Sequence, residues 1–491
     1  MSENNKDKGI SEIEINDQRI IANVELNLIE ALIPVVALMA MLAYNIFYAG
    51  GELLGSYSNH YILLIAGFIA AVVGLLNNSS VKLMFTEVIE NLNKIKVPIF
   101  ILLLVGALSG TWLVSGIIPA MVYYGLQVLN PTIFLPASIV IAIIISIATG
   151  SSWTTSATVG IALIGIGTAL GIPTGMVAGA VISGAYFGDK MSPLSDTTNL
   201  APAMAGTDLF THIRYMSLTT IPTIIITIII FSFLSMNIET SGNADIVFLL
   251  TSIDETFNIS PLLFIVPGVV VALIIMKTKP LIALSIGVLL AAVFAFIFQT
   301  DLIKELSTSS FMTVIKSIFV DTAITTDNDM LNELFSSGGM LGMMWTILLI
   351  ISAMIFGGIM DGIGALARIT NELLKMAKSI FGLFSSTVLS CFGLNVIASD
   401  QYLAIVIPGK MYEKAYKDRG LAPENLSRTL EDAGTVTSVL VPWNTCGAYQ
   451  SQVLGVGVGE YFAYAIFNYL SPFMTLIFAG FNIKIKQLVK S

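Results

Sequence analysis

Runs of apolar residues long enough to cross a bilayer dominate this chain. Leu28–Tyr48, Tyr61–Leu76, Tyr215–Met236 and Leu281–Gln299 are examples, and a membrane-spanning helix needs roughly 20 such residues. Only 11% of the 491 residues are charged and 55% are hydrophobic, whereas soluble domains carry about 25% charged residues. The composition therefore predicts an all-α polytopic membrane protein.

The charges and cysteines argue against several other classes. The formal net charge is −9 and no basic tract occurs, which argues against a nucleic-acid partner. Cys391 and Cys446 lie inside apolar segments and form neither a disulfide framework nor a metal-binding spacing. The glycine-rich stretches contain neither a phosphate-binding loop nor a dinucleotide fingerprint, so we do not expect transport driven by ATP bound on this chain. No cofactor is expected. Residues 1–24 are polar and of mixed charge, and we expect a short disordered cytoplasmic tail there.

Three sequence blocks recur in the same order in the two halves of the chain. Residues 347–374 align with 101–128 at an offset of 246 (347 − 101), and 394–409 align with 145–160 at an offset of 249 (394 − 145). The Pro-Trp-Asn-Thr that begins at residue 442 falls on the Pro-Leu-Ser-Asp that begins at residue 193, again at 249 (442 − 193). This order predicts an internal duplication with a first repeat at 25–236, a linker at 237–260 and a second repeat at 261–482.

Lysines indicate the orientation, because cytoplasmic loops of membrane proteins collect basic residues. Lys82 and Lys94 follow the second span, and Lys277 and Lys279 follow the first span of the second half. The first half then begins inside and the second begins outside, so the repeats are predicted to be inverted. Each would hold about five spans, a re-entrant hairpin and a broken helix. The linker would be extracytoplasmic, and both termini, including a tail at 483–491, cytoplasmic. Secondary transporters of this design bind substrate near the midplane.

Two polar segments lie between the predicted spans. In Ser79–Lys96, apolar residues recur at helical spacing opposite Lys82, Glu87 and Glu90, which predicts an amphipathic helix lying in the membrane interface. The segment Asp301–Leu341 is expected to be an acidic loop.

Carboxylates and hydroxyls gather in residues 148–160, ATGSSWTTSATVG, and in residues 184–202, GAYFGDKMSPLSDTTNLAP. Broken backbone at membrane depth is tolerated only inside protein or beside water, and ionisable residues there are costly enough to indicate function. Hard oxygen atoms can replace the hydration shell of sodium, and burial favours a protonated carboxyl group. The alternative is a loop at the membrane surface with ordinary caps and turns.

The candidate ion- or substrate-binding residues, taken from these stretches and their counterparts in the second half, are Asp189, Ser192, Asp196, Thr197, Thr198, Asn199, Ser151, Ser152, Asp400, Asn444 and Thr445. Among them the candidate sodium ligands are Asp189, Asp196 and Asp400. For Asp400, a helix N-cap is the alternative, and it is compatible with a site role.

A second group of charged residues lies outside these stretches. Arg428 is three and four residues from Glu431 and Asp432, a spacing that places it on one helix face with both acids. Asp361 falls on Ser115 in the repeat alignment. These four are possible relay residues. The alternatives are a structural ion pair for the first three and an interfacial carboxylate for Asp361.

The string GDKMSPLSDTTN at 188–199, together with ATGSSWTTSATVG before it, resembles the NhaC family of sodium/proton antiporters. The likeness extends over most of residues 28–482. It implies an ion-transporter-type fold with a scaffold and a mobile transport domain, often dimeric, in a bacterial or archaeal inner membrane. It also implies coupling of sodium ions to protons. The family includes malate/lactate antiporters and other carriers of small carboxylates or amino acids.

We therefore expect a secondary active sodium/proton antiporter rather than an enzyme, with Na+ and H+ as the transported ions and with carboxylates that bind them alternately. A sodium- or proton-coupled antiporter of a small organic acid or amino acid is the alternative. An intramembrane aspartyl protease is weaker, because Gly188-Asp189 is followed by Lys190 and lacks the rest of a protease signature. A passive channel is also weaker, since inverted repeats favour a carrier.

Overall fold

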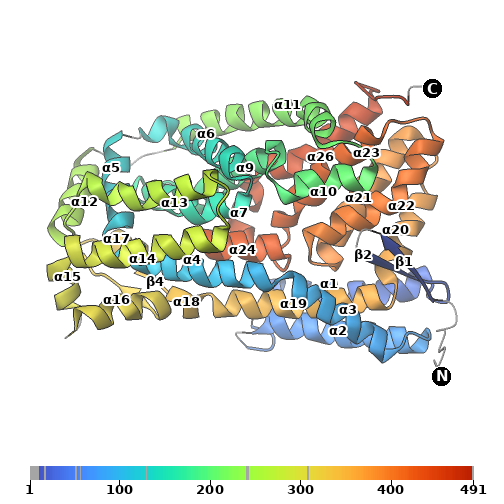
Figure 1. The fold of residues 1–491 in the computed structure, drawn as a ribbon, viewed down its shortest axis with the longest axis horizontal. Helices are drawn as coiled ribbons and strands as arrows, with labels where there is room; N and C mark the ends of the chain where they lie inside the picture. Colours follow the sequence, from blue (N-terminus) through green and yellow to red (C-terminus); the bar gives the residue numbers. More distant parts are fainter. Residues whose placement is uncertain are drawn as a thin grey trace.

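The computed structural model describes residues 10–15, 18–49, 52–55, 57–128, 130–238, 243–306 and 309–488. Within these ranges eight helices are long and apolar enough to cross a membrane, or ten if each of two bent helix pairs counts as one span. Helices make up nearly all of the architecture (Figure 1), and the described strands form two small two-stranded sheets. The prediction of an all-α polytopic membrane fold is confirmed.

The first half of the chain ends with a long helix that follows a series of interrupted ones. Its elements are β1 (Ile10–Ile15), β2 (Gln18–Asn23), α1 (Leu28–Phe47), α2 (Ser58–Leu76), α3 (Val81–Lys94), α4 (Lys96–Val114), α5 (Ile117–Val128), α6 (Pro131–Thr149), α7 (Ser152–Thr155), the π-helix η1 (Ser156–Gly160), α8 (Ile161–Ala169), α9 (Thr174–Met191), α10 (Asp196–Ala205) and α11 (Leu209–Met236).

The second half contains more short elements. These are α12 (Asn243–Thr256), the 3-10 helix η2 (Pro261–Phe264), α13 (Ile265–Ile275), α14 (Pro280–Phe298), α15 (Thr300–Glu305), α16 (Ser310–Phe319), β3 (Thr322–Ala323), α17 (Asp329–Leu334), β4 (Ser336–Ser337), α18 (Gly339–Gly342), α19 (Met344–Gly362), α20 (Ala365–Lys375), α21 (Ile380–Ile397), α22 (Gln401–Asp418), α23 (Pro423–Leu430), the π-helix η3 (Glu431–Thr435), the 3-10 helices η4 (Ser438–Leu440) and η5 (Phe462–Tyr464), α24 (Thr445–Leu454), α25 (Val458–Tyr461) and α26 (Ile466–Gly480).

The helices of the two halves break at corresponding places. Between α4 and α5 the chain turns at Gly116, with φ of +78°, and between α19 and α20 it turns at Gly364, with φ of +77°, two residues beyond the Gly362 that the alignment pairs with Gly116. Residues with side chains rarely adopt such angles, so glycine ends each helix there. The helix α10 begins after the N-cap Ser195 and α24 begins after the N-cap Asn444, which are 249 residues apart (444 − 195). The inverted orientation of the halves stays a prediction.

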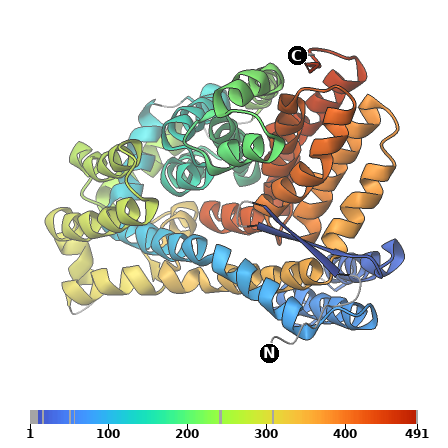
Figure 2. The ribbon, with the colours of Figure 1, turned by 45° about the vertical axis from the view of Figure 1, so that its right-hand side comes forward.

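The described residues pack into a large core cluster built on α4–α9 and α13–α14, a smaller one on α1, α2 and α19, a third on α10, α21–α23 and α26, and a fourth, small one between α4, α14, α15 and α16. The helices α2, α3 and α19 lie side by side along the lower part of the molecule (Figure 2). The tip between α21 and α22 also packs against α19, because Gly357 leaves room for the carbonyl of Ala398. The N-terminal hairpin and the segment after α26 lie at the same end of the molecule (Figure 1).

The helix α3 packs on α19 through part of its predicted apolar face. Its buried residues are Leu83, Met84, Glu87 and Asn91, so Glu87, predicted on the polar face, is buried as well. Gly358 and Gly362 of α19 have no side chains and allow the backbone of α3 to approach within contact distance at Val88 and Met84. Close packing on these glycines therefore contributes to setting the rotation of α3.

The N-terminal residues are more ordered than predicted. Instead of a disordered tail over 1–24, β1 and β2 pair as an antiparallel hairpin with Ile10 opposite Asn23. Isoleucine favours strands, and Ile21 is buried where β2 packs on α20. Residues 1–9 lie outside the described part of the chain.

Two segments expected to be loops or linkers contain helices. The predicted acidic loop Asp301–Leu341 holds α15 to α18 and the β3–β4 pair, and α16 packs on α4 where Gly110 faces the carbonyl of Ser317. The predicted linker 237–260 contains α12, which bends by 85° into η2 and α13. Tertiary packing on α4 and α5 orders these segments.

Candidate ion-binding site

The tip between α6 and α7 meets the end of α9 through one carboxylate. Asp189, only 8% exposed, accepts a hydrogen bond from the Ser152 hydroxyl at 2.7 Å and another from the Ser152 backbone N–H at 3.2 Å. Gly150 permits this approach, because a Cβ there would lie 2.6 Å from the Cβ of Leu194 and 3.0 Å from the nitrogen of Ser195. Ser151 caps α7 by accepting from the Thr154 N–H at 3.2 Å.

Three of the side chains predicted as ligands instead form hydrogen bonds that hold the break between α9 and α10. Ser192 Oγ donates to the Ile147 carbonyl at 2.9 Å. Thr198 Oγ1 contacts the carbonyls of Asp189 and Lys190 at 3.1 Å each, and Asn199 Nδ2 donates to the Ser195 carbonyl at 2.7 Å. These three side chains stabilise the interruption itself.

Thr197 and Ser195 lie at the start of α10. The Thr197 hydroxyl lies 3.2 Å from Ser195 Oγ, and both side chains are buried. Together with Asp189 and Ser152 they place several hard oxygen atoms at one end of α9, a donor set suited to a cation that prefers oxygen ligands.

The second tip uses its acid differently. Asp400 is the N-cap of α22 and accepts from the Leu403 N–H at 2.9 Å, which is the alternative role foreseen for it. Thr445, at the start of α24, donates its N–H to the Ser399 carbonyl at 3.0 Å. Asn444 donates its amide to the Asn395 carbonyl at 3.0 Å. These contacts join the second tip to the second break.

Asp196 lies on the exposed side of the break. It is exposed in the structure, and its carboxylate accepts from the Tyr402 hydroxyl at 3.4 Å. The Tyr402 hydroxyl is also within electrostatic range of Asp189 and Asp400. The three candidate sodium ligands therefore face one region, although the described residues contain no group of three or more acidic, histidine or cysteine side chains able to hold one metal ion.

The buried ion pair differs from the predicted one. Lys190 pairs with Asp432, and both side chains are fully buried. Asp432 also accepts from Thr219 Oγ1 at 2.8 Å and is contacted by Thr475 and Ser471. Arg428, expected to pair with Asp432 or Glu431, forms no ion pair with either acid. The π-helical turn that begins at Glu431 changes the register, so the i+3 and i+4 spacing no longer sets the contacts.

Glu431 stands next to this pair without a partner of its own. It is fully buried, and neither carboxylate oxygen has a hydrogen-bond partner among the described residues. The hydroxyl groups of Thr435 and Thr197 lie near its carboxyl group, and Lys190 and Asp189 are its charged neighbours. An ionised carboxylate in such a place would be strongly destabilised, whereas a protonated carboxyl group costs far less.

Asp361 is separate from this group. It lies near the end of α19, buried, between α3 and the second tip, and its electrostatic neighbours are Lys94 and Glu90 on α3. The structure thus brings Glu431 and Asp432 to the Asp189 region, and places Asp361 beside α3.

The sequence interpretation missed Lys190 and Tyr402 as members of the site. Lys190 was noted only as the residue after Asp189, yet a lysine inside an apolar helix is itself a signal of a buried acid. Tyr402 follows Asp400 by two residues at the start of α22, and this position next to a candidate acid could have indicated it.

These features define a class of protein. A polytopic helical membrane protein whose interrupted helices and helix tips gather buried carboxylates is a membrane transporter. The chain belongs to the Na+/H+ antiporter family, whose family model matches residues 184–483. The predicted NhaC relationship is thereby confirmed.

Three relatives show how the family extends. The Na+/H+ antiporter NhaC of Alkalihalophilus pseudofirmus is 39% identical over 86% of this chain and 90% of its own length. The malate-2H+/Na+-lactate antiporter of Bacillus subtilis is 36% identical over 86% of this chain and 87% of that protein. The arginine/ornithine antiporter ArcD of Halobacterium salinarum is 35% identical over 79% of this chain and 80% of its own length. All three relatives are named as antiporters.

Proposed function

We propose that this protein exchanges sodium ions for protons across the inner membrane of a bacterium or archaeon, with both termini cytoplasmic. Family membership supports antiport. The observation that carries the assignment of a site is the contact of Asp189 with both donors of Ser152, because it joins the end of α9 to a helix tip through a buried carboxylate.

Sodium would bind at this contact. The Ser152 hydroxyl now donates to Asp189, and rotation about its C–O bond would turn an oxygen lone pair toward an arriving cation. Asp189 then supplies the charge, while Ser195 and Thr197 offer further neutral oxygens nearby. No cofactor is proposed.

Glu431 would carry the proton. With no hydrogen-bond donor at either oxygen, the group is best accommodated in its neutral form in this arrangement. When water or sodium reaches the contact at Asp189, ionisation of Glu431 becomes less costly and the proton leaves. Proton release from Glu431 and sodium binding at Asp189 would thus be coupled by their proximity, so that one ion replaces the other.

Exchange of a small carboxylate or amino acid is the second candidate. The malate/lactate and arginine/ornithine relatives are almost as similar to this chain as the NhaC protein. Near the tips, Trp153 stacks on Tyr449 with ring centroids 3.9 Å apart, and Tyr402 points to Asp196. Aromatic and polar groups of this kind are common in organic ligand sites.

Purified protein in liposomes tests the two candidates together. With sodium inside and a pH dye in the lumen, an outward sodium gradient should acidify the lumen in the absence of any organic solute. Acidification that requires malate, lactate or an amino acid would replace the first candidate with the second. Sodium release that is coupled neither to proton movement nor to uptake of an added organic solute would contradict both.

A further inference from the structure

A row of ionisable residues runs along α23 and η3 toward the candidate site. Glu424 and Arg428 are four residues apart on α23, Asp432 lies in the π-helical turn η3 that follows, and all three are buried. Asp432 pairs with Lys190, which directly follows Asp189. The charges alternate in sign from Glu424 to Asp189, and the row forms a polar seam through an apolar bundle.

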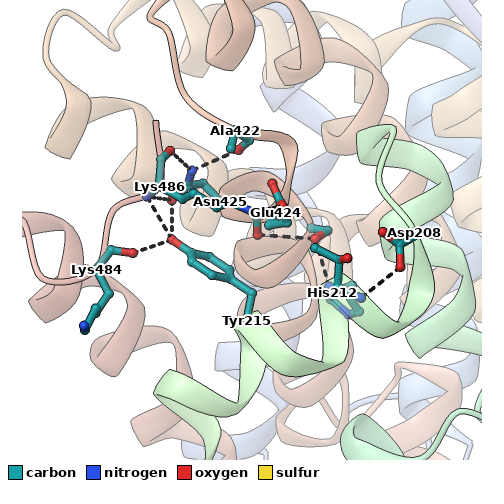
Figure 3. A network of polar contacts seen from close by, with 10 residues as sticks. Asp208, His212, Tyr215, Ala422, Glu424, Asn425, Lys484 and Lys486 are labelled. Atoms are coloured by element: carbon teal, nitrogen blue, oxygen red, sulfur yellow. Dashed lines mark hydrogen bonds and ion pairs between the residues drawn. The ribbon is translucent and has the colours of Figure 1, made fainter. Parts of the chain in front are cut away.

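The outer end of the row is closed by the segment after α26. Lys486 pairs with Glu424, and its side chain is 47% exposed. Asn425 donates to the Lys486 carbonyl at 2.7 Å, and the Tyr215 hydroxyl donates to the Lys484 carbonyl at 2.6 Å. Figure 3 shows Tyr215, from α11, directed at this segment from below. The seam therefore reaches the surface of the molecule at Lys486.

Arg428 lies in the middle of the row without a counter-charge. Its side chain is fully buried, and Nε, Nη1 and Nη2 have no hydrogen-bond partner in the part of the chain that the structure describes. The guanidinium carbon lies 4.6 Å from the centre of the Tyr215 ring and 5.7 Å from that of Phe478. Aromatic faces stabilise a cation but leave its positive charge in place.

We propose that Arg428 is a fixed electrostatic barrier that prevents sodium from leaking along this seam between the Asp189 site and the end of the molecule that carries Lys486. The inference rests on the proposed sodium transport at Asp189. An arginine suits such a barrier, because it stays protonated at any physiological pH. A cation that enters the seam past the Glu424–Lys486 pair meets an uncompensated positive charge at Arg428, the device that pores use to exclude cations.

The test compares sodium flux with proton flux in liposomes. Radiolabelled sodium and luminal pH are followed together, with potassium and valinomycin present to compensate charge. Arg428→Gln removes the charge, and Arg428→Met keeps the length of the stem if the glutamine variant does not purify as a folded protein. We expect sodium efflux uncoupled from proton entry to rise by about a hundredfold, the factor that a unit charge a few ångströms away supplies at protein permittivities. Arg428→Lys should keep the flux coupled.

A matched control comes from a second arginine. Arg419 at the end of α22 contacts the backbone carbonyls of Ala377 and Ser379 and lies off the seam, so Arg419→Gln should behave as wild type. If sodium efflux stayed strictly coupled to proton entry in the neutral Arg428 variants, Arg428 would not be the barrier that we propose. Loss of all sodium flux in a folded neutral variant would overturn it as well, because that outcome assigns Arg428 to ion or substrate binding. Absence of sodium/proton exchange in the wild type would instead remove the proposed function.

Discussion

The two helix tips share a backbone design but hold their acids at different places. At the first tip Ser151 caps the helix and Ser152 contacts Asp189. At the second tip Asp400 caps the helix, and the pair equivalent to Ser152 and Asp189 is Gln401 and Ser438, 249 residues on, at 3.5 Å. The carboxylate that bridges tip and break is therefore present only in the first half.

This difference shows that a duplicated backbone can carry the charged side chain of a binding site in only one of its two halves. Both tips need an N-cap, and either serine or aspartate satisfies it. Only the first half places a charge between the tip and the helix end, where a cation can replace a hydrogen-bond donor. The second half keeps neutral side chains at the corresponding contact, which suits a supporting role.

Replacing the bridging acid should have the largest effect. In Asp189→Asn we expect exchange to fall by about a hundredfold or more, since a charge contact at 4 Å is worth roughly 4 kcal/mol at an effective permittivity near 20. Ser438→Ala, at the equivalent position, should change the rate by about twofold or less. Sodium-driven luminal acidification in liposomes measures both. Equal losses of exchange rate in Asp189→Asn and Ser438→Ala would contradict the proposed difference between the two halves.

Glu431→Gln should uncouple sodium transport from proton transport. Its equivalent in the first half is Ile182 (431 − 249), so the duplication supplies no second group of this kind. The variant should still bind sodium, but its sodium flux should no longer depend on the pH gradient, because the glutamine cannot release a proton. Flux recorded with and without a pH gradient checks this. An unchanged dependence would exclude Glu431 as the proton carrier.

The tip side chains should differ in their effect on sodium affinity. Ser152→Ala removes a hydrogen bond to a charged group, and we expect the sodium concentration for half-maximal exchange to rise about tenfold. Gln401→Ala, the matched change in the second half, should leave that concentration within about twofold of wild type. Concentration curves for sodium decide the matter. A larger effect at Gln401 would move the cation site to the second tip.

The capping aspartate should act mainly on stability. Asp400→Asn keeps a good N-cap, whereas Asp400→Ala should lower the free energy of unfolding by about 1 kcal/mol. Thermal unfolding in detergent can compare these variants with Ser151→Ala, which should lose a similar amount. Loss of exchange in a stable Asp400→Asn protein would instead show that Asp400 binds the ion.

The smallest effect is expected at Asp196. Its carboxylate is exposed and has one long contact, to Tyr402 at 3.4 Å, so solvent screens its charge. Asp196→Asn should reduce exchange by about twofold or less, the range of weak exposed contacts. The same liposome assay measures the rate. A loss as large as that of Asp189→Asn would place Asp196 in the site.

The interruptions could be predicted because their signals are local. Glycines such as Gly150 and the capping residues Ser195 and Asn444 act on the backbone within a few positions of themselves. The alignment of the halves then transferred each break to its counterpart. This is why the ends of α6, α9 and α21 lie where the sequence placed them.

The charged contacts could not be predicted, because their partners are far apart in the chain. Lys190 and Asp432 are separated by 242 residues, and no local spacing links them. The local spacing that was available, from Arg428 to Glu431 and Asp432, gave the wrong pair because a π-helical turn intervenes. The inward face of α3 likewise depends on glycines of α19, which the pattern of α3 alone does not contain.

The account depends on sodium binding at the contact between the first tip and α9 being coupled to proton release from the neighbouring Glu431. Equilibrium binding of radiolabelled sodium to the purified protein, measured over a range of pH, tests this most directly. We predict that the wild type binds sodium more weakly as the pH falls and that Asp189→Asn shows no saturable binding. Wild-type affinity in Asp189→Asn, with the same response to pH, would contradict the account.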